Sequence, residues 1–400
     1  MRVLLLDDSF TSWLGHNAAY NAAIVNELNQ RGISSEVFAN TKAADLQNDF
    51  AHGLHPVFRN YATMTLGSPA KFGPQRFIDK LVRLIKANWD HYKDLSQRVT
   101  SEVSDGDCII VCMQSAGTSF AYSLWVRQML AKGLNVSILL IIHNAPIKTF
   151  RLEVKSLRKL IRNNHLAFAA HTTAVVEFCR RNADITPTLL PLPHLPHLVP
   201  NEPIEFNSPK FATLFGYFGL ASQGKGFDVL VDALPYMAGL LREGKIRFAI
   251  QATPYSNDVA AQSKCERLAQ LAQELPGIEV IDQPLSDSEY MIRMQQADIV
   301  VIPNRAEAYK YALSGTFAEA VSLGKPVVVA KGTYMAETLA LHNTNTEFIS
   351  GDPASLAKAL ESTYQVAPQL SLDASRRAKQ WAAYHNASSF VDRLLPLFKL

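Results

Sequence analysis

The feature that most limits the fold of this chain is a regular alternation between short, mostly apolar runs and amphipathic stretches. The runs in the first half read VLLL, SSEVFA, DCIIVCM and VSILLII, and those in the second half read FATLFGYFG, IRFAIQA, IEVIDQ, ADIVVIPN and KPVVVA. Between them lie helical patterns such as the one over 226–234, where Phe227, Leu230, Val231 and Leu234 recur at helical spacing. Alternation of this kind predicts an α/β protein with doubly wound parallel sheets.

The length of the chain predicts two domains. Its 400 residues exceed the ~100–200 residues that a single domain usually holds. A stretch over 187–203 contains six prolines among few helix formers, and we interpret it as an interdomain linker. We therefore predict domains over 1–200 and 201–378, followed by a terminal helix over 379–400 that packs back on the first domain.

Composition excludes several classes of protein. A formal net charge of +3 is too small to indicate nucleic acid as the main partner. The apolar run of Val3 to Leu6 ends at two aspartates, far short of a signal peptide or a membrane-spanning helix, so we expect a cytoplasmic protein. The four cysteines show no CxxC spacing. Asp105 and Asp107 precede a strand, at the edge of the sheet that does not bind ligands, and we interpret them as a turn and predict no catalytic metal.

A glycine-containing loop follows the first strand of the second half. It includes Gly219, Ser222, Gly224 and Gly226 and leads into a helix at Phe227, and Lys225 lies where a cation can reach a phosphate. Helix starts after parallel strands present free N–H groups to anions. The alternative is an ordinary β-turn-α connection with a solvated lysine.

A second loop of the same kind follows the strand that ends at Pro303. Its next helix starts near Ser314, Gly315 and Thr316, which offer two hydroxyls and a bare backbone, and Glu319 lies one turn further on. A carboxylate beside such small residues can accept both hydroxyls of a ribose. The alternative is a carboxylate on a solvated helix face.

These motifs, in this order over roughly 210–335, resemble the donor domain of retaining GT-B glycosyltransferases, especially glycosyltransferase family 4. The resemblance implies two Rossmann-like domains that face a cleft. It also implies that Lys225 holds the diphosphate of a nucleotide sugar, with Ser222, Gly224, Ser314, Gly315 and Thr316 around it, and that Glu319 holds the ribose. No cofactor or metal is expected besides the nucleoside diphosphate sugar.

The chain departs from that family at two places. The family has a second glutamate before the one that binds ribose, and Tyr311 stands at the corresponding place here. A tyrosine cannot supply a carboxylate, so we expect the sugar contact to be rebuilt, with Glu307 as a candidate. The arginine that often precedes the loop lysine is also absent, which leaves the donor's base and sugar open.

The first half offers candidates for the acceptor side. Gly15, His16 and Asn17 occupy a predicted helix start, and His143 and Asn144 follow a buried strand. The resemblance implies that the Gly15 loop approaches the donor phosphate and the acceptor, and that His143 assists transfer. His171 and Thr172 resemble a later strand end of that family. The alternative is that these histidines are ordinary loop residues held by hydrogen bonds.

A basic amphipathic helix is predicted over 71–94. Lys71, Arg76, Lys80, Arg83 and Lys86 alternate there with apolar side chains. Such a helix can lie on an anionic membrane, on whose inner face a lipid-linked acceptor would be found, or it can pack its apolar face on its own domain.

We therefore expect a glycosyltransferase that moves a sugar to an acceptor hydroxyl of a glycan or lipid-linked acceptor, in polysaccharide or glycan synthesis. Two alternatives remain open. A nucleotide-sugar epimerase of the same fold would use acids and histidines of the site without an acceptor. A non-catalytic nucleotide-sugar-binding subunit would explain Tyr311.

Overall fold

The structure is a computed structural model of the chain, and it divides into two compact units. The first comprises Met1–His194 and His385–Leu400, and the second comprises Leu195–Tyr384. The described residues are 2–12, 16–48, 50, 53–59, 74–113, 118–143, 150–163, 165–193, 212–254, 258–340 and 346–398.

The described part of the first domain contains a parallel sheet of seven strands, in the order β3-β2-β1-β4-β5-β6-β7. The strands are β1 (Arg2–Asp7), β2 (Ser34–Asn40), β3 (Leu54–Phe58), β4 (Cys108–Met113), β5 (Ser137–Ile142), β6 (Leu166–Ala170) and β7 (Thr188–Leu189). The chain adds β2 and β3 on one side of β1 and then adds β4 to β7 on the other side. This change in the order of strand addition marks a doubly wound sheet, as the sequence predicts.

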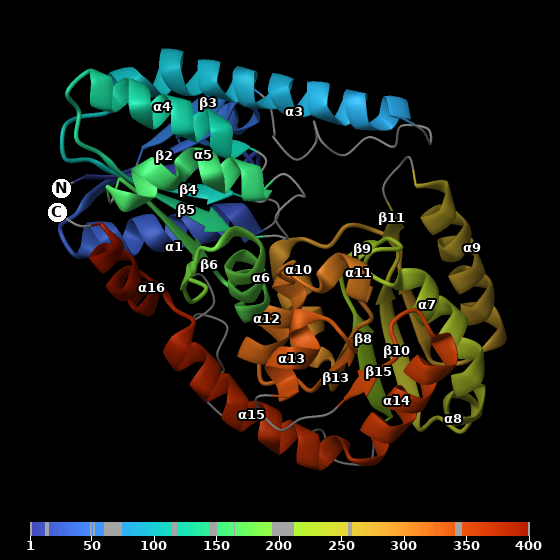
Figure 1. The fold of residues 1–400 in the computed structure, drawn as a ribbon. Coiled ribbons are helices and arrows are strands. Elements are labelled where there is room, and N and C mark those ends of the chain that lie inside the picture. The colour runs from blue at the N-terminus through green and yellow to red at the C-terminus, as the bar shows by residue number, and fades with distance from the viewer. Residues whose placement is uncertain are drawn as a thin grey trace. The chain divides into compact units, whose positions relative to one another are not determined.

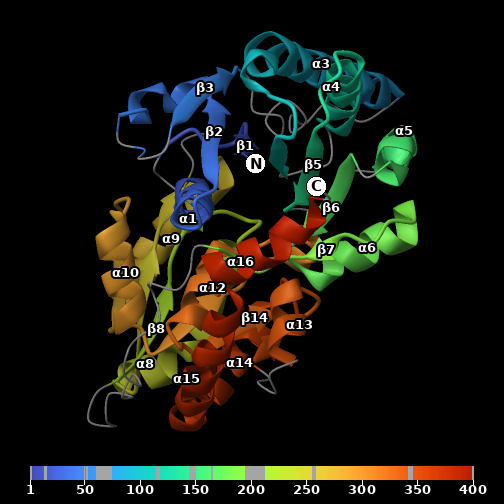
Figure 2. The same ribbon diagram turned by 90° about the vertical axis from the view of Figure 1, so that its left-hand side faces the viewer.

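Helices cover both faces of this sheet, and Figure 2 shows α3 and α4 together on one of them. The helices are α1 (His16–Gln30), α3 (Pro74–Asp94), α4 (Ser119–Ala131), α5 (Phe150–Arg162), α6 (Thr173–Ala183) and α16 (Ala387–Leu394). Cys108 and Cys112 are buried in the core between β4 and α1, so they fill space as free thiols.

The proline-rich stretch is a linker only in part. Residues 188–189 form β7, which pairs with β6, and Leu190 and Leu192 are buried. The predicted linker is therefore wrong for its first residues, because leucines between the prolines still find a core to pack in. Residues 194–203 of the stretch lie outside the described residues.

The described part of the second domain contains a six-stranded parallel sheet in the order β12-β10-β8-β13-β14-β15. Its strands are β8 (Thr213–Tyr217), β10 (Ile246–Gln251), β12 (Ile278–Ile281), β13 (Ile299–Ile302), β14 (Val327–Ala330) and β15 (Glu347–Phe348), and a separate pair joins β9 (Leu220–Ala221) to β11 (Thr253–Pro254). The chain adds β10 and β12 on one side of β8 and then adds β13 to β15 on the other side. The loops that follow β8 and β13 therefore flank the place where such sheets bind ligands.

Helices cover both faces of the second sheet as well. They are α7 (Phe227–Ala233), α8 (Ala238–Arg242), α9 (Val259–Glu274), α10 (Asp287–Gln296), α11 (Ala306–Tyr309), α12 (Gly315–Ser322), α13 (Tyr334–Ala340), α14 (Pro353–Gln365) and α15 (Ala367–Tyr384). Figure 1 shows α7, α9 and α14 on one face of the sheet and α12 and α13 on the other.

Two terminal helices divide between the domains. Trp381 of α15 packs its ring on Phe317 of α12, with 6.0 Å between ring centroids, and α15 therefore belongs to the second domain. Phe390, Val391 and Leu394 of α16 lie in the core of the first domain. The chain thus returns to the first domain at His385, several residues after the predicted boundary at 378.

No helix in the described ranges combines the length and the apolar character that crossing a lipid bilayer requires.

Close approach of two backbones fixes the loop between β8 and α7. Gly226 has a φ of 66°, and a methyl group on its Cα would lie 1.9 Å from the carbonyl oxygen of Pro303, at the end of β13. The neighbouring backbone bond runs from the Arg305 N–H to the Gly224 oxygen, over 3.0 Å. Only glycine allows the two loops beside the ligand edge to touch in this way.

A buried lysine lies at the opposite, amino edge of the same sheet. The ammonium of Lys325 donates to the carbonyl of Gln295 over 2.5 Å, and burial lowers its pKa to about 8, against the opposing effect of the Asp298 carboxylate. Asp298 in turn accepts a hydrogen bond from the Leu214 N–H at 2.8 Å. These contacts close the bottom of β8, β13 and β14, far along the strands from the ligand edge.

We expect Gly226→Ala to lower the free energy of unfolding by more than about 2 kcal/mol, because the methyl group overlaps backbone and the φ is unfavourable for alanine. Gly239→Ala is the matched control, since Gly239 lies in α8 with no atom near its added methyl group, and it should leave stability unchanged or raise it by up to about 1 kcal/mol. Urea denaturation measures both, and equal stability of the two variants would contradict the close packing.

We expect the stability of the wild type, relative to Lys325→Met, to rise by about 1 kcal/mol between pH 7 and pH 9. The pKa of Lys325 is lower in the folded than in the unfolded chain, so the unfolded chain binds more protons between pH 7 and pH 9. This proton binding favours the unfolded state less as the pH rises, and the free energy of unfolding therefore increases. Lys245→Met should show no such slope, because an exposed pair with Glu243 raises the pKa of Lys245. Urea midpoints at both pH values give the comparison.

Candidate functional site

The glycine loop of the second domain starts in a conformation reserved for glycine. Gly219, directly after β8, has a φ of 128°, and its N–H donates to the side-chain oxygen of Gln251 over 2.7 Å. Gln251 is the last residue of β10 and is buried. This bond ties the loop to the neighbouring strand and turns the chain back toward the sheet edge.

Lys225 lies over that turn. Its ammonium nitrogen is 2.9 Å from the place that a methyl group on Gly219 would occupy. Burial lowers the pKa of Lys225, and the negative charge of Glu319 opposes the shift. Within the described ranges the ammonium donates no hydrogen bond. A largely buried cation without an acceptor is costly, so this group is suited to an anion that arrives from outside.

The start of α12 supplies a second anion-binding group. Ser314 is the N-cap, and its hydroxyl accepts the Phe317 N–H at 3.3 Å, while the Ala318 N–H bonds to the Ser314 carbonyl at 3.1 Å. In the described part of the chain, this leaves the N–H groups of Gly315 and Thr316 without acceptors. Two unpaired donors at a helix start form an anion site.

Ser314 makes several contacts within its own domain. Its own N–H donates to the phenol oxygen of Tyr334 over 3.0 Å, and its hydroxyl also lies 3.5 Å from the Asn304 amide nitrogen. Its N–H and its hydroxyl oxygen therefore both hold the helix start, and Ser314 is buried. The neighbouring backbone N–H groups of Gly315 and Thr316 offer donors to a diphosphate, and the predicted contact of Ser314 itself stays a prediction.

Glu319 lies on the same edge of the sheet as Lys225. One carboxylate oxygen, Oε2, accepts a hydrogen bond from the phenol of Tyr290 over 2.6 Å. The other, Oε1, faces Gly315 and would be 3.9 Å from a methyl group there. The charge of Glu319 acts on the ammonium of Lys225, so the two predicted donor residues lie near one another at this edge.

The remaining donor candidates lie in the loop after β13. Glu307 is exposed on α11, and the Tyr311 ring lies 5.5 Å from the ammonium of Lys310. Ser222 is half-buried in the glycine loop, where its carbonyl accepts the Phe227 N–H. None of these contacts joins Glu307 to Lys225 or Glu319 within the described ranges, and its predicted sugar contact stays a prediction.

Arg305 does not replace the missing arginine of the glycine loop. Its guanidinium forms an ion pair of 2.5 Å with Asp228, in the first turn of α7. Gly351 lies against the same guanidinium, and its φ of 82° favours glycine there. The pair fastens the β13 loop to the helix that follows Lys225.

The first domain gathers its predicted histidines at the carboxyl edge of its own sheet. His143 follows β5 and His171 follows β6, and their ring centroids are 4.9 Å apart. The Tyr20 ring lies edge-on to both, and its hydroxyl is hydrogen-bonded to His171 over 2.9 Å. Gly15, Asn144 and the side chain of His16 lie outside what the structure describes.

The turn before β4 behaves as a structural element. Asp107 pairs with Arg2 at 2.7 Å and accepts the Ser104 N–H, and Asp105 accepts the Asn135 N–H at 2.7 Å. Among the described residues, no three His, Cys, Asp or Glu side chains gather in a group that could hold a metal ion.

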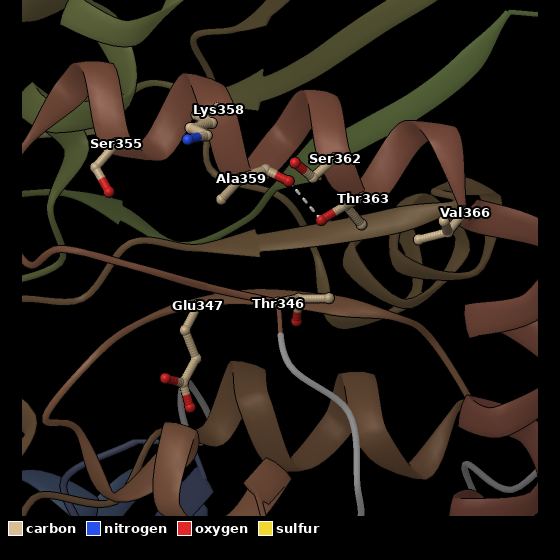
Figure 3. A pocket seen from close by; sticks show the side chains of 8 residues that line it. All are labelled: Thr346, Glu347, Ser355, Lys358, Ala359, Ser362, Thr363 and Val366. Carbon is tan, nitrogen blue, oxygen red and sulfur yellow. Dashed lines mark hydrogen bonds between the residues drawn. The ribbon is translucent and has the colours of Figure 1, made fainter.

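A pocket of about 290 Å³ lies elsewhere in the second domain, between α14 and β15 (Figure 3). Three of its hydroxyl groups already have partners. Ser355 accepts the Ile349 N–H at 2.9 Å, Thr363 donates to the Ala359 carbonyl at 2.6 Å, and Thr346 donates to the Val327 carbonyl. No predicted site residue lines this pocket, and we do not assign it to the site.

No sequence pattern points to three of the side chains that shape the site. Tyr290 lies on the same helical stripe as the buried Met294, so it is read as a core residue. Gln251 ends a strand and Tyr334 starts a helix. Neither residue stands out in the sequence, because polar groups are common at such positions. Their importance depends on contacts between distant segments.

Comparison with known proteins agrees with this architecture. Residues 212–365 match the family described as Glycosyl transferases group 1. No curated protein sequence matches the chain significantly.

Solved structures match over nearly the whole length. HepE from Anabaena, in complex with UDP, has 13% sequence identity and a TM-score of 0.67 over 99% of each chain. A glycosyltransferase from Rickettsia africae has 13% identity and a TM-score of 0.68, over 100% of this chain and 98% of that one. A UDP-forming α,α-trehalose-phosphate synthase from Burkholderia xenovorans, in complex with glucose-6-phosphate, has 13% identity and a TM-score of 0.66 over 100% of both.

These matches confirm the predicted fold class, two Rossmann-like domains of the GT-B type. The family match covers most of the second domain, the one that holds Lys225 and Glu319. The chain is therefore a GT-B protein whose residues 212–365 match the group 1 glycosyl transferases, and these findings support a glycosyltransferase enzyme.

Proposed function

We propose that the protein is a retaining glycosyltransferase of the family 4 type, which moves a sugar from a nucleoside diphosphate sugar to an acceptor hydroxyl. The observation that carries the proposal is the buried ammonium of Lys225, which donates no hydrogen bond within the described ranges. It shares one sheet edge with the two unpaired N–H groups of α12 and with the Glu319 carboxylate. A diphosphate next to a ribose matches this set of a cation, two donors and an acceptor.

The same groups explain how the reaction is assisted. As the bond between the anomeric carbon and the diphosphate oxygen breaks, negative charge grows on the departing diphosphate. Lys225 and the N–H groups of Gly315 and Thr316 stabilise that charge, and they are held in place before the reaction by the Ser314 cap and the Gly219 turn. We propose that these protein groups suffice and that no metal is required.

The first domain holds the acceptor in this proposal. His143 and His16 lie at strand and helix ends of that domain, where we place them next to the acceptor hydroxyl. The trehalose-phosphate synthase neighbour is in complex with glucose-6-phosphate, which supports a sugar as the acceptor class. The neighbour bound to UDP supports a nucleotide sugar as the donor class.

Two other functions share this site and give different results. An epimerase would convert a donor sugar without any acceptor, whereas a transferase needs the second substrate. A binding subunit would bind nucleotide and turn nothing over. Incubation of the purified protein with UDP- and GDP-sugars, alone and with sugar acceptors, separates the three.

We further propose that the protein acts in the cytoplasm and touches the anionic inner face of a membrane through α3. Val82, Ile85 and Trp89 of this helix are 57%, 62% and 52% exposed, and they form one apolar stripe. The ammonium of Lys93 lies 5.5 Å from the Trp89 ring, and Lys86 is exposed beside it. Exposed apolar side chains next to lysines suit the boundary of an anionic bilayer, where a lipid-linked glycan acceptor would lie.

We expect Lys225→Ala and Glu319→Ala each to weaken binding of UDP or GDP, with a rise in Kd of about 10- to 150-fold for Lys225→Ala. Loss of the buried ammonium should not destabilise the free protein, because burial already disfavours that charge. Lys245→Ala is the control, since that lysine is exposed at the amino edge of the sheet. Isothermal titration calorimetry gives the Kd, and unchanged binding in both site variants would refute the assignment.

We expect the wild type to float with vesicles that contain phosphatidylglycerol and not with pure phosphatidylcholine vesicles. Trp89→Glu should reduce flotation several-fold, because it places a carboxylate on the stripe that faces the lipid. Tyr236→Glu is the control, since Tyr236 is 66% exposed on the second domain. If both variants float like the wild type, α3 is not the contact surface.

A further inference from the structure

The hydrogen bond between Tyr290 and Glu319 joins two elements of the second domain that are distant in sequence. Tyr290 lies in the first half of α10, and its phenol donates to Oε2 of Glu319 in α12 over 2.6 Å. The Tyr290 ring packs edge-on against Phe218, with 6.2 Å between ring centroids. Phe218 directly follows β8, so the ring is held between the glycine loop and the carboxylate.

The network extends to the helix start. The Thr316 side chain, in the first turn of α12, also acts on the Tyr290 phenol and opposes the rise of its pKa. Burial and the charge of Glu319 raise the pKa of Tyr290 well above its usual value. The phenol therefore remains a neutral donor wherever Glu319 is ionised.

This bond fixes the orientation of the Glu319 carboxylate. A glutamate side chain on a half-buried helix position has several rotamers, and ordering it for a ligand costs free energy at the moment of binding. Tyr290 occupies Oε2 and holds the group in one orientation, in which Oε1 faces Gly315. Each carboxylate oxygen has two acceptor sites, so hydroxyl groups of a ligand can still be accepted.

We propose that Tyr290 is a positioning residue, which fixes the Glu319 carboxylate for the two hydroxyls of a ribose and thereby makes the site selective for ribonucleotides. This inference rests on the proposed function, because it takes Glu319 as the ribose acceptor. It adds a residue whose effect depends on those hydroxyls and vanishes in their absence.

The experiment measures binding by calorimetry with UDP, GDP and ADP and with their 2′,3′-dideoxy analogues. Tyr290→Phe keeps the ring against Phe218 and removes only the hydroxyl. We expect this variant to weaken binding of the ribose form of the preferred nucleotide by about 3- to 10-fold. Binding of its dideoxy analogue should change less than twofold, so the wild-type preference for ribose shrinks.

Two further variants separate positioning from a loss of structure. Glu319→Ala should remove the ribose preference, and adding Tyr290→Phe to it should have no further effect on Kd. Tyr122→Phe is the matched control, since the Tyr122 hydroxyl bonds to His91 at 2.8 Å and is buried in the first domain. It removes a comparable buried hydroxyl and should leave both affinities unchanged.

Each remaining outcome has a distinct meaning. If Tyr290→Phe weakens both forms equally, tightens the ribose form or changes neither, Tyr290 does not position the carboxylate, although the proposed function stands. If the wild type binds none of the nucleotides, the proposed function fails, and the role of Tyr290 fails with it.

Discussion

A largely buried ammonium that has no hydrogen-bond acceptor in the described ranges is the feature on which the interpretation of this molecule depends. Folded proteins rarely bury a cation without a partner, because removing the charge from water costs several kcal/mol per ion. Lys225 is in that state at the ligand edge of the second sheet, with Glu319 as the charge that acts on it.

The two buried lysines of the second domain show why position matters more than burial. Lys325 is the more enclosed of the two, with 4% exposure, and its ammonium donates to the Gln295 carbonyl at the amino edge, where it closes the ends of three strands. Lys225 lies at the carboxyl edge beside the unpaired N–H groups of α12. The same side chain is structural at one end of a strand and ready for a ligand at the other, because helix starts gather only at the second edge.

Much of this arrangement follows from the sequence. Each of the nine apolar runs contains a strand, and the order of motifs places Lys225 and Glu319 at one edge. The apolar runs do not predict every strand. β6 escapes because its sequence LAFAA is rich in alanine, and β3 escapes because it is an edge strand that contains a proline. Short strands such as β15 form only because a neighbour is already in place.

The parts of the site that could not be predicted are those set by contacts between distant segments. Ser314 has the chemistry of a phosphate ligand, and its N–H also bonds to Tyr334 while its hydroxyl oxygen caps the helix. Tyr290 has the pattern of a core residue, but its hydroxyl reaches a carboxylate. The local sequence pattern gives the chemistry of a side chain and the face of the element on which it lies. Its hydrogen-bond partner depends on which side chains the completed sheet brings together.

The return of the chain to its first domain has a consequence for biosynthesis. Phe390, Val391 and Leu394 supply part of the hydrophobic core built around β1 and α1, although they follow the whole second domain in the chain. The ribosome therefore releases the whole second domain before the first can complete its interior. Until then α1 lacks the part of its apolar covering that α16 provides.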